Sequence, residues 1–247
     1  MAFSERMIWY QIPGRAKRLI ANGSMLVAVS AQDQKLYQCR IPCDGQMNNW
    51  QVMKQPEAAP IQSMSMNKEE IWVTSANNAI YRCRLPCDDG AWERVAGLLK
   101  SIVVDDQRVY GLHNGKFYQA KLTEEEGYYP NVRWYQCPSV QPAQLKKLAI
   151  HNESIWALDS SNQLYEYNKY IQAWLSRPGQ FLTITINDEY MYGVNQKNKK
   201  LQRCKNPCND GDWEGHLGDD SGFISSLTSN NAAVYIIING NIYLGLN

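Results

Sequence analysis

The cysteines of this chain are the residues whose spacing could support chemistry. Six of the seven stand as C-x3-C pairs, as in the stretch YRCRLPCDDGAW at residues 81–92. Each pair is followed by a turn and a tryptophan. Such a pair could supply half of a metal site, carry a redox reaction or close a local disulfide. The pairs are Cys39 with Cys43, Cys83 with Cys87, and Cys204 with Cys208.

These chemistries make different demands on the rest of the sequence. A zinc site needs four ligands, usually from two cysteine pairs, and the chain has only three histidines, His113, His151 and His216. A redox site is typically C-x-x-C within a βαβ pattern, which this sequence lacks. A disulfide between residues four apart fits the distance that two bridged Cα atoms require. We therefore expect three local disulfides, with free thiols as the alternative. Cys137 has no evident partner, so it is either buried or joins two chains.

The tryptophans show that the cysteine phrase belongs to an internal repeat. Their spacings are 41, 42, 42, 40 and 39 residues, and the count from the last one through both chain ends to the first is 43. A period that survives the crossing of the chain ends indicates a ring in which the N-terminal segment completes the last repeat. The six positions are Trp9, Trp50, Trp92, Trp134, Trp174 and Trp213.

Each repeat consists of short apolar runs separated by turn residues. One such pair of runs is IWVTS at 71–75 and IYRC at 80–83, with asparagines between them. Asn and Gly tolerate the positive φ that tight hairpin turns need. No stretch shows a sustained helical period of apolar residues. The sequence therefore predicts an all-β fold.

The architecture that fits six such units is a six-bladed β-propeller of four-stranded antiparallel blades. We expect a single domain over residues 1–247, closed by pairing of residues 7–10 with residues 242–244. In such a ring the tryptophan strand is the outermost strand of its blade, and backbone hydrogen bonds leave no open edge between the first and last repeats.

The repeat resembles the tectonin repeat, most clearly in residues 71–113, and the similarity covers essentially the whole chain. The chain is also similar to the fish-egg lectins and the horseshoe-crab tachylectin of that family, in which C-x3-C before the tryptophan is usual. The resemblance implies a non-catalytic propeller of innate defence that binds bacterial lipopolysaccharide or terminal or methylated saccharides. Tectonin repeats also occur in intracellular proteins involved in autophagy. Two departures are that repeats three and four lack both cysteines and that Gln202 replaces the usual tyrosine.

A sugar site needs an aromatic face for the pyranose and polar groups for its hydroxyls. An aromatic residue recurs on the predicted second strand of five repeats, and asparagines occupy the turn that follows it. Packing between neighbouring blades is the alternative for the rings, and turn geometry alone would explain the asparagines. The candidate residues are Trp72, Tyr110, Trp156, Tyr192 and Tyr235, together with Asn77, Asn78, Asn114, Asn162, Asn198 and Asn239.

One hairpin of the fifth repeat is rich in basic residues. Its side chains could meet phosphates or acidic sugars, or they could form an ordinary solvated edge that protects against aggregation. They are Lys197, Lys199, Lys200, Arg203 and Lys205. Another polar turn, residues 208–212, contains enough oxygen ligands for a calcium ion but lacks the spacing of known calcium loops. We therefore expect no cofactor, with calcium at this turn as the alternative.

Composition and motifs narrow the range of functions. The net charge of +1 gives no global attraction for nucleic acid or for anionic membranes, and no stretch is long and apolar enough to insert into a bilayer. Signatures of enzymes are absent, so we expect a protein that is not an enzyme.

Two hypotheses on function follow. The first is a secreted, multivalent lectin that recognises glycans or lipopolysaccharide on cell surfaces and that could form an oligomer. The sequons at residues 22–24 and 152–154 and the expected disulfides agree with an oxidising, extracellular location. The second is a cytoplasmic propeller that binds proteins and has no affinity for sugars.

Overall fold

The computed structural model describes residues 7–43, 49–56, 60–122, 132–137, 144–208, 212–215 and 222–246. The regular structure in these ranges is β-strand, and they contain no α-helix. Accordingly, the described residues include no helix with the length and apolar character needed to cross a membrane. The all-β prediction is confirmed.

The chain divides into two compact units, which we describe separately. The terminal unit comprises Met1–Val52 and Arg177–Asn247, and the central unit comprises Met53–Ser176. The strands of the terminal unit are β1 (Ile8–Ala21), β2 (Met25–Ser30), β3 (Leu36–Arg40), β17 (Tyr190–Asn195), β18 (Leu201–Lys205), β19 (Ile224–Ser229), β20 (Val234–Ile238) and β21 (Asn241–Leu246).

The central unit contains most of the remaining strands. They are β5 (Ile61–Met66), β6 (Glu70–Ser75), β7 (Ala79–Arg84), β8 (Glu93–Leu98), β9 (Ser101–Val104), β10 (Arg108–His113), β11 (Lys116–Lys121), β12 (Tyr135–Gln136), β13 (Leu145–His151), β14 (Ser154–Asp159) and β15 (Gln163–Asn168). Two strands, β4 (Gln51–Met53) and β16 (Ala173–Ile186), include residues of both units.

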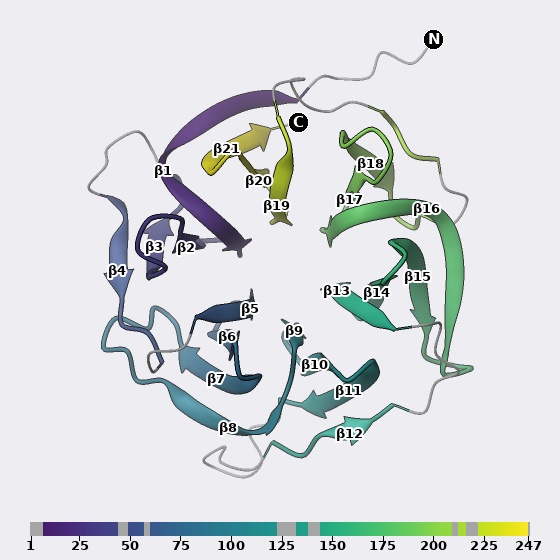
Figure 1. Cartoon of the computed structure of the whole chain (residues 1–247), viewed down its shortest axis with the longest axis horizontal. Helices are drawn as coiled ribbons and strands as arrows, with labels where there is room; N and C mark the ends of the chain where they lie inside the picture. The colour runs from purple at the N-terminus through teal and green to yellow at the C-terminus, as the bar shows by residue number, and fades with distance from the viewer. Residues whose placement is uncertain are drawn as a thin grey trace. The chain divides into compact units, whose positions relative to one another are not determined.

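The strands form four sheets, whereas the sequence predicts six separate blades. The sheet orders are β19-β20-β21-β1-β2-β3-β4, β5-β6-β7-β8, β12-β11-β10-β9 and β13-β14-β15-β16-β17-β18. The number is smaller because β1 and β16, with 14 residues each, pair with a different neighbour along each half. Figure 1 shows β1 passing from β21 to β2.

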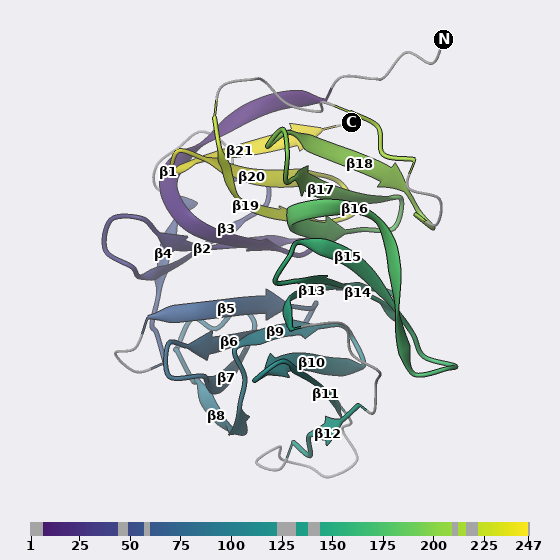
Figure 2. The ribbon, with the colours of Figure 1, turned by 45° about the vertical axis from the view of Figure 1, so that its right-hand side comes forward.

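We call each group of consecutive strands a blade. Blade 1 contains the second half of β1 with β2, β3 and β4; blade 2 contains β5–β8; blade 3 contains β9–β12. Blade 4 contains β13–β15 and the first half of β16, blade 5 the second half of β16 with β17 and β18, and blade 6 β19–β21 with the first half of β1. Figure 2 shows the strands of blade 6 stacked on one another, and those of blade 4 likewise. Blades 5, 6 and 1 lie in the terminal unit and blades 2, 3 and 4 in the central unit.

The N-terminal strand completes blade 6, as the sequence predicts. Trp9 pairs with Gly245 and Tyr10 with Leu244 in an antiparallel ladder. The register of β1 shifts after Ile12, and its second half then pairs with β2. A shift of this kind bends a strand, which lets a single strand belong to two blades.

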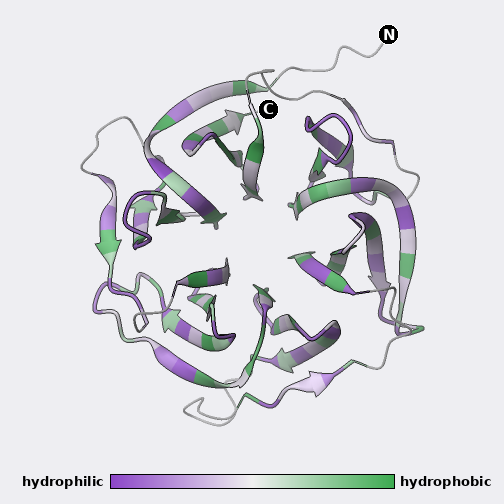
Figure 3. Cartoon of the chain, viewed as in Figure 1, coloured by the Kyte–Doolittle hydropathy of each residue, from purple (hydrophilic) through white to green (hydrophobic). Residues whose placement is uncertain are grey.

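The second strands are covered on both faces and form the centre of the core. Every residue of β2 and β20 is buried. Such a strand has a continuous apolar run rather than an alternating one. In contrast, β1 is largely exposed or half-buried, with only Ile12, Ala16 and Leu19 buried, and its bands of green and purple are visible in Figure 3. Burial of one Ile or Leu side chain contributes roughly 1.5–3 kcal/mol, so these strands supply much of the stability.

Asparagines at the turn between the first and second strands link neighbouring blades. In the central unit, Nδ2 of Asn67 donates to the carbonyl of Asp105 at 2.9 Å. In the terminal unit, Asn187 donates to the carbonyl of Asn230, and Asn230 to that of Asn22, both at 2.9 Å. The Oδ1 atoms of the three donors accept backbone N–H groups of their own turns. Each of these side chains therefore shapes its turn and holds the next blade.

Candidate binding surface

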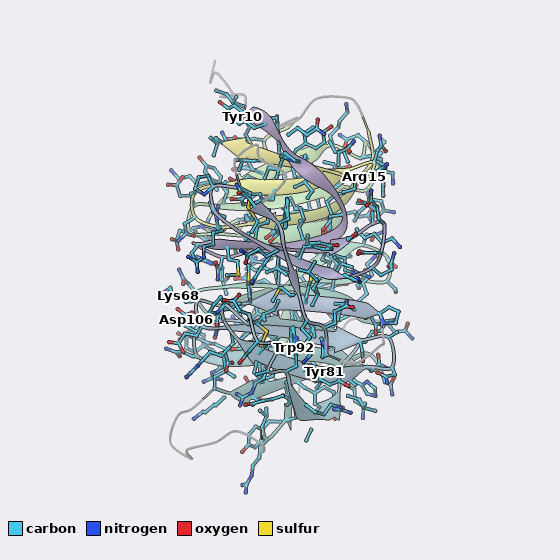
Figure 4. The ribbon with its side chains drawn as sticks, turned by 90° about the vertical axis from the view of Figure 1, so that its left-hand side faces the viewer. Tyr10, Arg15, Lys68, Tyr81, Trp92 and Asp106 are labelled. Atoms are coloured by element: carbon cyan, nitrogen blue, oxygen red, sulfur yellow. A yellow bond between two sulfur atoms is a disulfide. The ribbon has the colours of Figure 1, made fainter. Side chains whose placement is uncertain are left out.

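The hairpin between the second and third strands lies beside the start of the first strand of the same blade. In blade 1 the N–H of Ala31 donates to the carbonyl of Arg15, and in blade 5 the N–H of Gln196 donates to that of Gln180. We call this side of a blade the turn end, and the opposite side, where the third strand leaves the sheet, the loop end. Figure 4 shows Arg15 and Tyr10 well separated along β1.

The predicted polar residues lie at the turn ends. Asn78, Asn114, Asn162 and Asn239 have positive φ angles of 65°, 49°, 68° and 52°. These are left-handed turn conformations that Asn adopts more readily than most residues. Turn geometry therefore accounts for these four asparagines without a ligand.

The two other predicted asparagines, Asn77 and Asn198, accept backbone hydrogen bonds within their own hairpins. Oδ1 of Asn77 accepts the N–H of Ala79 at 3.3 Å. In blade 5, Oδ1 of the exposed Asn198 accepts the N–H of Lys200 at 3.0 Å, and the positive φ, 61°, falls on Lys199.

The predicted sugar platforms are buried on the second strands. The exposed fraction is 0% for Trp72 and Tyr192, 2% for Trp156 and Tyr235, and 4% for Tyr110. A ring covered on both faces cannot stack against a pyranose. The burial favours the alternative interpretation, in which these rings pack between blades.

The rings and the asparagines are also separated along the strand. Each asparagine follows the ring of its blade by four to six residues and lies in the turn beyond the end of the strand. At about 3.3 Å per residue of extended chain, the two groups are at most roughly 13–20 Å apart. The structure therefore does not bring together the two halves of the predicted sugar site.

Internal partners fix several of these rings. The indole N–H of Trp72 donates to Glu70 and that of Trp156 to Ser154, both at 3.0 Å. Tyr110 stacks on Phe117 with ring centroids 5.8 Å apart. Burial raises the pKa of the Tyr110 hydroxyl to about 12. These contacts are those of core residues.

Three of the six repeated tryptophans tie the outer strands to the crossovers between blades. The indole N–H of Trp50 donates to the carbonyl of Pro13, and that of Trp134 to the carbonyl of Ala96, both at 2.8 Å. Trp92 donates to Lys54 in the same way. Each acceptor is the fourth residue after the preceding tryptophan, so the hydrogen bonds follow the repeat.

A glycine after the acceptor permits this contact. Gly97 has a φ of 107°, which residues with a side chain rarely adopt, and a Cβ atom there would lie 3.0 Å from Nε1 of Trp134. Gly14, with a φ of 121°, occupies the corresponding place below Trp50. Since only glycine suits both the φ and the close approach, these two positions depend on it.

Each C-x3-C pair forms its own disulfide. The Cα atoms are 5.8, 5.7 and 5.6 Å apart in the bridges Cys39–Cys43, Cys83–Cys87 and Cys204–Cys208. The disulfide prediction is confirmed, and the free-thiol and zinc alternatives no longer apply to these six residues. The turn proposed for calcium falls largely outside the described residues, because 209–211 are not among them.

Cys137 is a free, buried thiol. It packs with Phe117 and Trp174, and its backbone N–H donates to the carbonyl of Phe117. Burial raises the pKa of the thiol to about 11. A sulfur atom buried in this way cannot form a disulfide with a second folded chain. Of the two alternatives for Cys137, the buried residue is therefore the one that the structure supports.

The structure shows two buried arginines that the sequence reasoning missed or misplaced. Arg82 is 5% exposed and pairs with Glu93 at 2.6 Å. Arg203, which was predicted to belong to a basic surface hairpin, is 6% exposed and pairs with Glu214 at 2.8 Å. Burial by itself lowers the pKa of Arg203, but the hydrogen bond and charge of Glu214 outweigh it and raise the pKa.

A signal for these pairs exists in the sequence. Arginine precedes the first cysteine of the pair only in blades 2 and 5, and glutamate follows the tryptophan only in the same two blades. The other residues of the basic hairpin remain at the surface: Lys197, Lys199 and Lys205 are exposed, and Lys200 is half-buried.

No family model and no curated protein matches the sequence, whereas solved structures do. A protein of unknown function from Bacteroides thetaiotaomicron has a TM-score of 0.68 at 11% identity, covering 96% of this chain and 70% of its own. YCF48 bound to a D1 peptide has a TM-score of 0.60 at 10% identity, covering 98% and 95%. Prp20p from Saccharomyces cerevisiae has a TM-score of 0.59 at 10% identity, covering 96% and 69%.

At these identities the likeness concerns the fold alone, and it does not confirm membership of the tectonin lectin family. The neighbours are β-propeller proteins, and the described strands are antiparallel groups of the same kind. This chain has a β-propeller fold.

Proposed function

We propose that this protein is a non-enzymatic propeller that binds a protein partner through the turn ends of its blades. The observation that carries the proposal is the burial of all five predicted sugar platforms. What remains accessible at the turn ends is a set of polar turns and charged side chains. Such groups suit recognition of a protein surface, where electrostatic complementarity sets specificity and the rate of association.

Two structural neighbours support this proposal, because each is described together with a peptide or proteins that it binds. The YCF48 structure contains a D1 peptide, and the Prp20p structure is described with its binding to Gsp1p and histones. Both proteins therefore use a propeller fold in contact with protein ligands. The same use of the fold is proposed for this chain.

The proposal includes the closure of six blades into one ring. The repeat period that continues through the chain ends and the pairing of β1 with β21 support it. Small-angle X-ray scattering of the full chain tests it, since a closed ring gives a more compact profile than two separate units. A profile that fits only two flexibly joined bodies would contradict closure.

Crosslinking mass spectrometry on an affinity-purified complex tests the protein-binding proposal. A lysine-reactive crosslinker should link the partner to turn-end lysines such as Lys116, Lys146 and Lys197. Lysines at the loop ends, Lys68 and Lys121, serve as internal controls. Crosslinks concentrated at the loop ends, or the lack of any reproducible partner, would count against it.

A multivalent lectin for cell-surface glycans or lipopolysaccharide is the second candidate. The three disulfides favour it, because they persist in oxidising compartments and belong to the motif that resembles the tectonin repeat. A glycan array that includes methylated and bacterial saccharides tests this candidate. Sugar-specific binding without a protein partner would reverse the order of the two candidates.

A further inference from the structure

Exposed charges are sorted between the two ends of the terminal unit. At its turn end, the exposed charged side chains of the described residues are almost all basic. The acidic exception is Asp33, which accepts hydrogen bonds from the hydroxyl of Tyr37 and the N–H of Lys35. The exposed basic residues at or next to this end are Arg15, Lys17, Arg18, Lys35, Lys197 and Lys199.

The loop end of the same unit has a mixed charge. Exposed Arg40 and Lys205 are offset there by exposed Asp188 and Glu189. Among the described residues, the turn end therefore has a local excess of positive charge that the net charge of +1 for the whole chain does not reveal. A concentration of one sign on one surface attracts and orients an oppositely charged ligand.

An exposed aromatic residue lies at the same end of the terminal unit, next to the turn that Arg15 contacts. Phe223 is 53% exposed and directly precedes β19. The next residue, Ile224, pairs with Ile238, and the carbonyl of the adjacent Asn239 accepts a hydrogen bond from Arg15 at 3.1 Å. Phe223 is therefore placed close to Arg15, between the hairpins of blades 5 and 1 that carry the lysines.

We infer that the turn end of the terminal unit is a docking surface for an acidic protein segment that carries an apolar side chain. Phe223 supplies the apolar anchor, and Arg15, Lys35, Lys197 and Lys199 supply the charged rim. Interfaces typically combine an aromatic centre with a polar rim of this kind. The inference rests on the proposed function and adds to it the surface and the chemistry of the partner.

The side chains favour a carboxylate-rich protein over other anions. Four of the six exposed basic residues are lysines, which act as mobile point charges, whereas bidentate recognition of phosphate favours the rigid fork of arginine. Phe223 is the exposed aromatic residue among the described residues of this end, so a row of rings for stacking bases or sugars is not present there. One ring with dispersed lysines fits an extended acidic peptide.

Binding of the full chain to a glutamate-rich peptide with one central leucine tests the inference. We expect binding at low salt that weakens as salt rises. Exchange of Lys197→Glu together with Lys199→Glu should lower the affinity about tenfold or more, because each replaces an attraction by a repulsion. Phe223→Ser should weaken binding of this peptide but not of a peptide with serine in place of the leucine.

The matched control is Arg40→Glu together with Lys205→Glu, which reverses two exposed charges at the loop end. It should leave the affinity within about twofold. Equal losses in both double variants, no binding at low salt, or tighter binding to heparin or to phosphatidylserine vesicles would overturn the inference. A partner crosslinked only at turn ends of the central unit, for example to Lys116 and Lys146, would overturn it and leave the proposed function intact. Peptide binding without any protein partner would count only against the proposed function.

Discussion

Arg82 and Glu93 join the third and outermost strands of blade 2 through a doubly hydrogen-bonded ion pair. Nε and Nη2 of Arg82 lie 2.9 and 2.6 Å from Oε2 of Glu93. The Arg82 side chain is 6% exposed and that of Glu93 52%. A third nitrogen, Nη1, lies 3.4 Å from Glu70, which also holds the indole of Trp72. One guanidinium therefore connects three strands.

Removal of the Glu93 carboxylate should destabilise the protein, because the buried guanidinium of Arg82 loses its closest partner. Glu93→Ala should lower the free energy of unfolding by about 1–3 kcal/mol, a value reduced from that of fully buried pairs since Glu93 is half-exposed. Urea denaturation measures the change. The double variant Arg82→Met with Glu93→Ala should recover much of the loss, because methionine leaves no buried guanidinium and Glu70 still accepts the indole N–H of Trp72. Equal destabilisation of the single and double variants would contradict this account.

The indole hydrogen bond of Trp134 should be measurable against a tryptophan that lacks one. Trp134→Phe removes the donor to the carbonyl of Ala96 and should cost about 1 kcal/mol. Trp213→Phe is the control: Nε1 of Trp213 is buried without a hydrogen-bond partner, and its ring packs on Phe181 with centroids 4.2 Å apart. Thermal unfolding should show the larger loss for Trp134→Phe. A larger loss for Trp213→Phe would show that ring packing, not the hydrogen bond, fixes the outer strands.

Asp105 occupies a place where three other blades have an asparagine that links to its neighbour. Burial raises the pKa of the Asp105 carboxyl above its ordinary value of 3.8, although the N–H groups of Gln107 and Arg108 partly oppose this. The folded chain therefore binds the proton more tightly than the unfolded chain, and the ionised carboxylate lowers stability above the folded pKa. This cost fades as the pH falls below the ordinary value.

Asp105→Asn should accordingly stabilise the protein at neutral pH. The amide keeps the acceptor for the turn and removes the charge, so we expect a gain of about 0.5–1 kcal/mol at pH 7. The gain should shrink as the pH is lowered through the raised pKa. Unfolding curves at several pH values check this. Asp106→Asn is the comparison: it removes an exposed ion pair with Lys68 and a minor contribution to the raised pKa of Asp105, so any gain should be smaller than that of Asp105→Asn. A gain that is independent of pH would refute the assignment to ionisation.

The sequence predicts the strands, the repeat and the disulfides because these depend on local patterns. The tryptophan period and the cysteine pairs recur at fixed offsets, so even the pairing of Trp9 with the last strand follows from counting. The burial of Trp72 and Tyr192 is harder to predict. An alternating pattern assigns residues to two faces, but in a propeller both faces of a second strand are covered by other blades.

The distribution of exposed charges between the two ends of the terminal unit is also hard to predict from the sequence. Lys35 and Lys197 stand more than 160 residues apart, and only the alternating direction of the strands places both at a turn end. Arg203 shows the opposite error, because it belongs to the same basic run as Lys205 yet points inward to Glu214. The two residues are two positions apart and share a face of β18. Lys205 is the last residue of the strand and is exposed, whereas Arg203 lies opposite Glu214 in a β-bridge and is buried.

The thiols provide the last test, since the three disulfides and Cys137 should respond differently to alkylation. Intact mass under non-reducing conditions should be lower by six hydrogens than that of the reduced chain. Iodoacetamide at neutral pH should not label the folded protein, because burial shields Cys137 and raises the pKa of its thiol to about 11. In urea without reductant, one thiol should react.

Removal of one bridge should lower stability by a moderate amount. The closed loop is short, so the chain-entropy model gives about 2 kcal/mol for Cys83→Ala with Cys87→Ala. Cys137→Ala is a poor control because it opens space in the core; Cys137→Ser is also unsuitable because it buries a hydroxyl. The matched comparison is the wild-type chain with and without reductant, in which all three bridges change at once and the sequence stays the same. Stability that is unaffected by reductant would show that the bridges contribute nothing to the stability of the fold and indicate only an oxidising compartment.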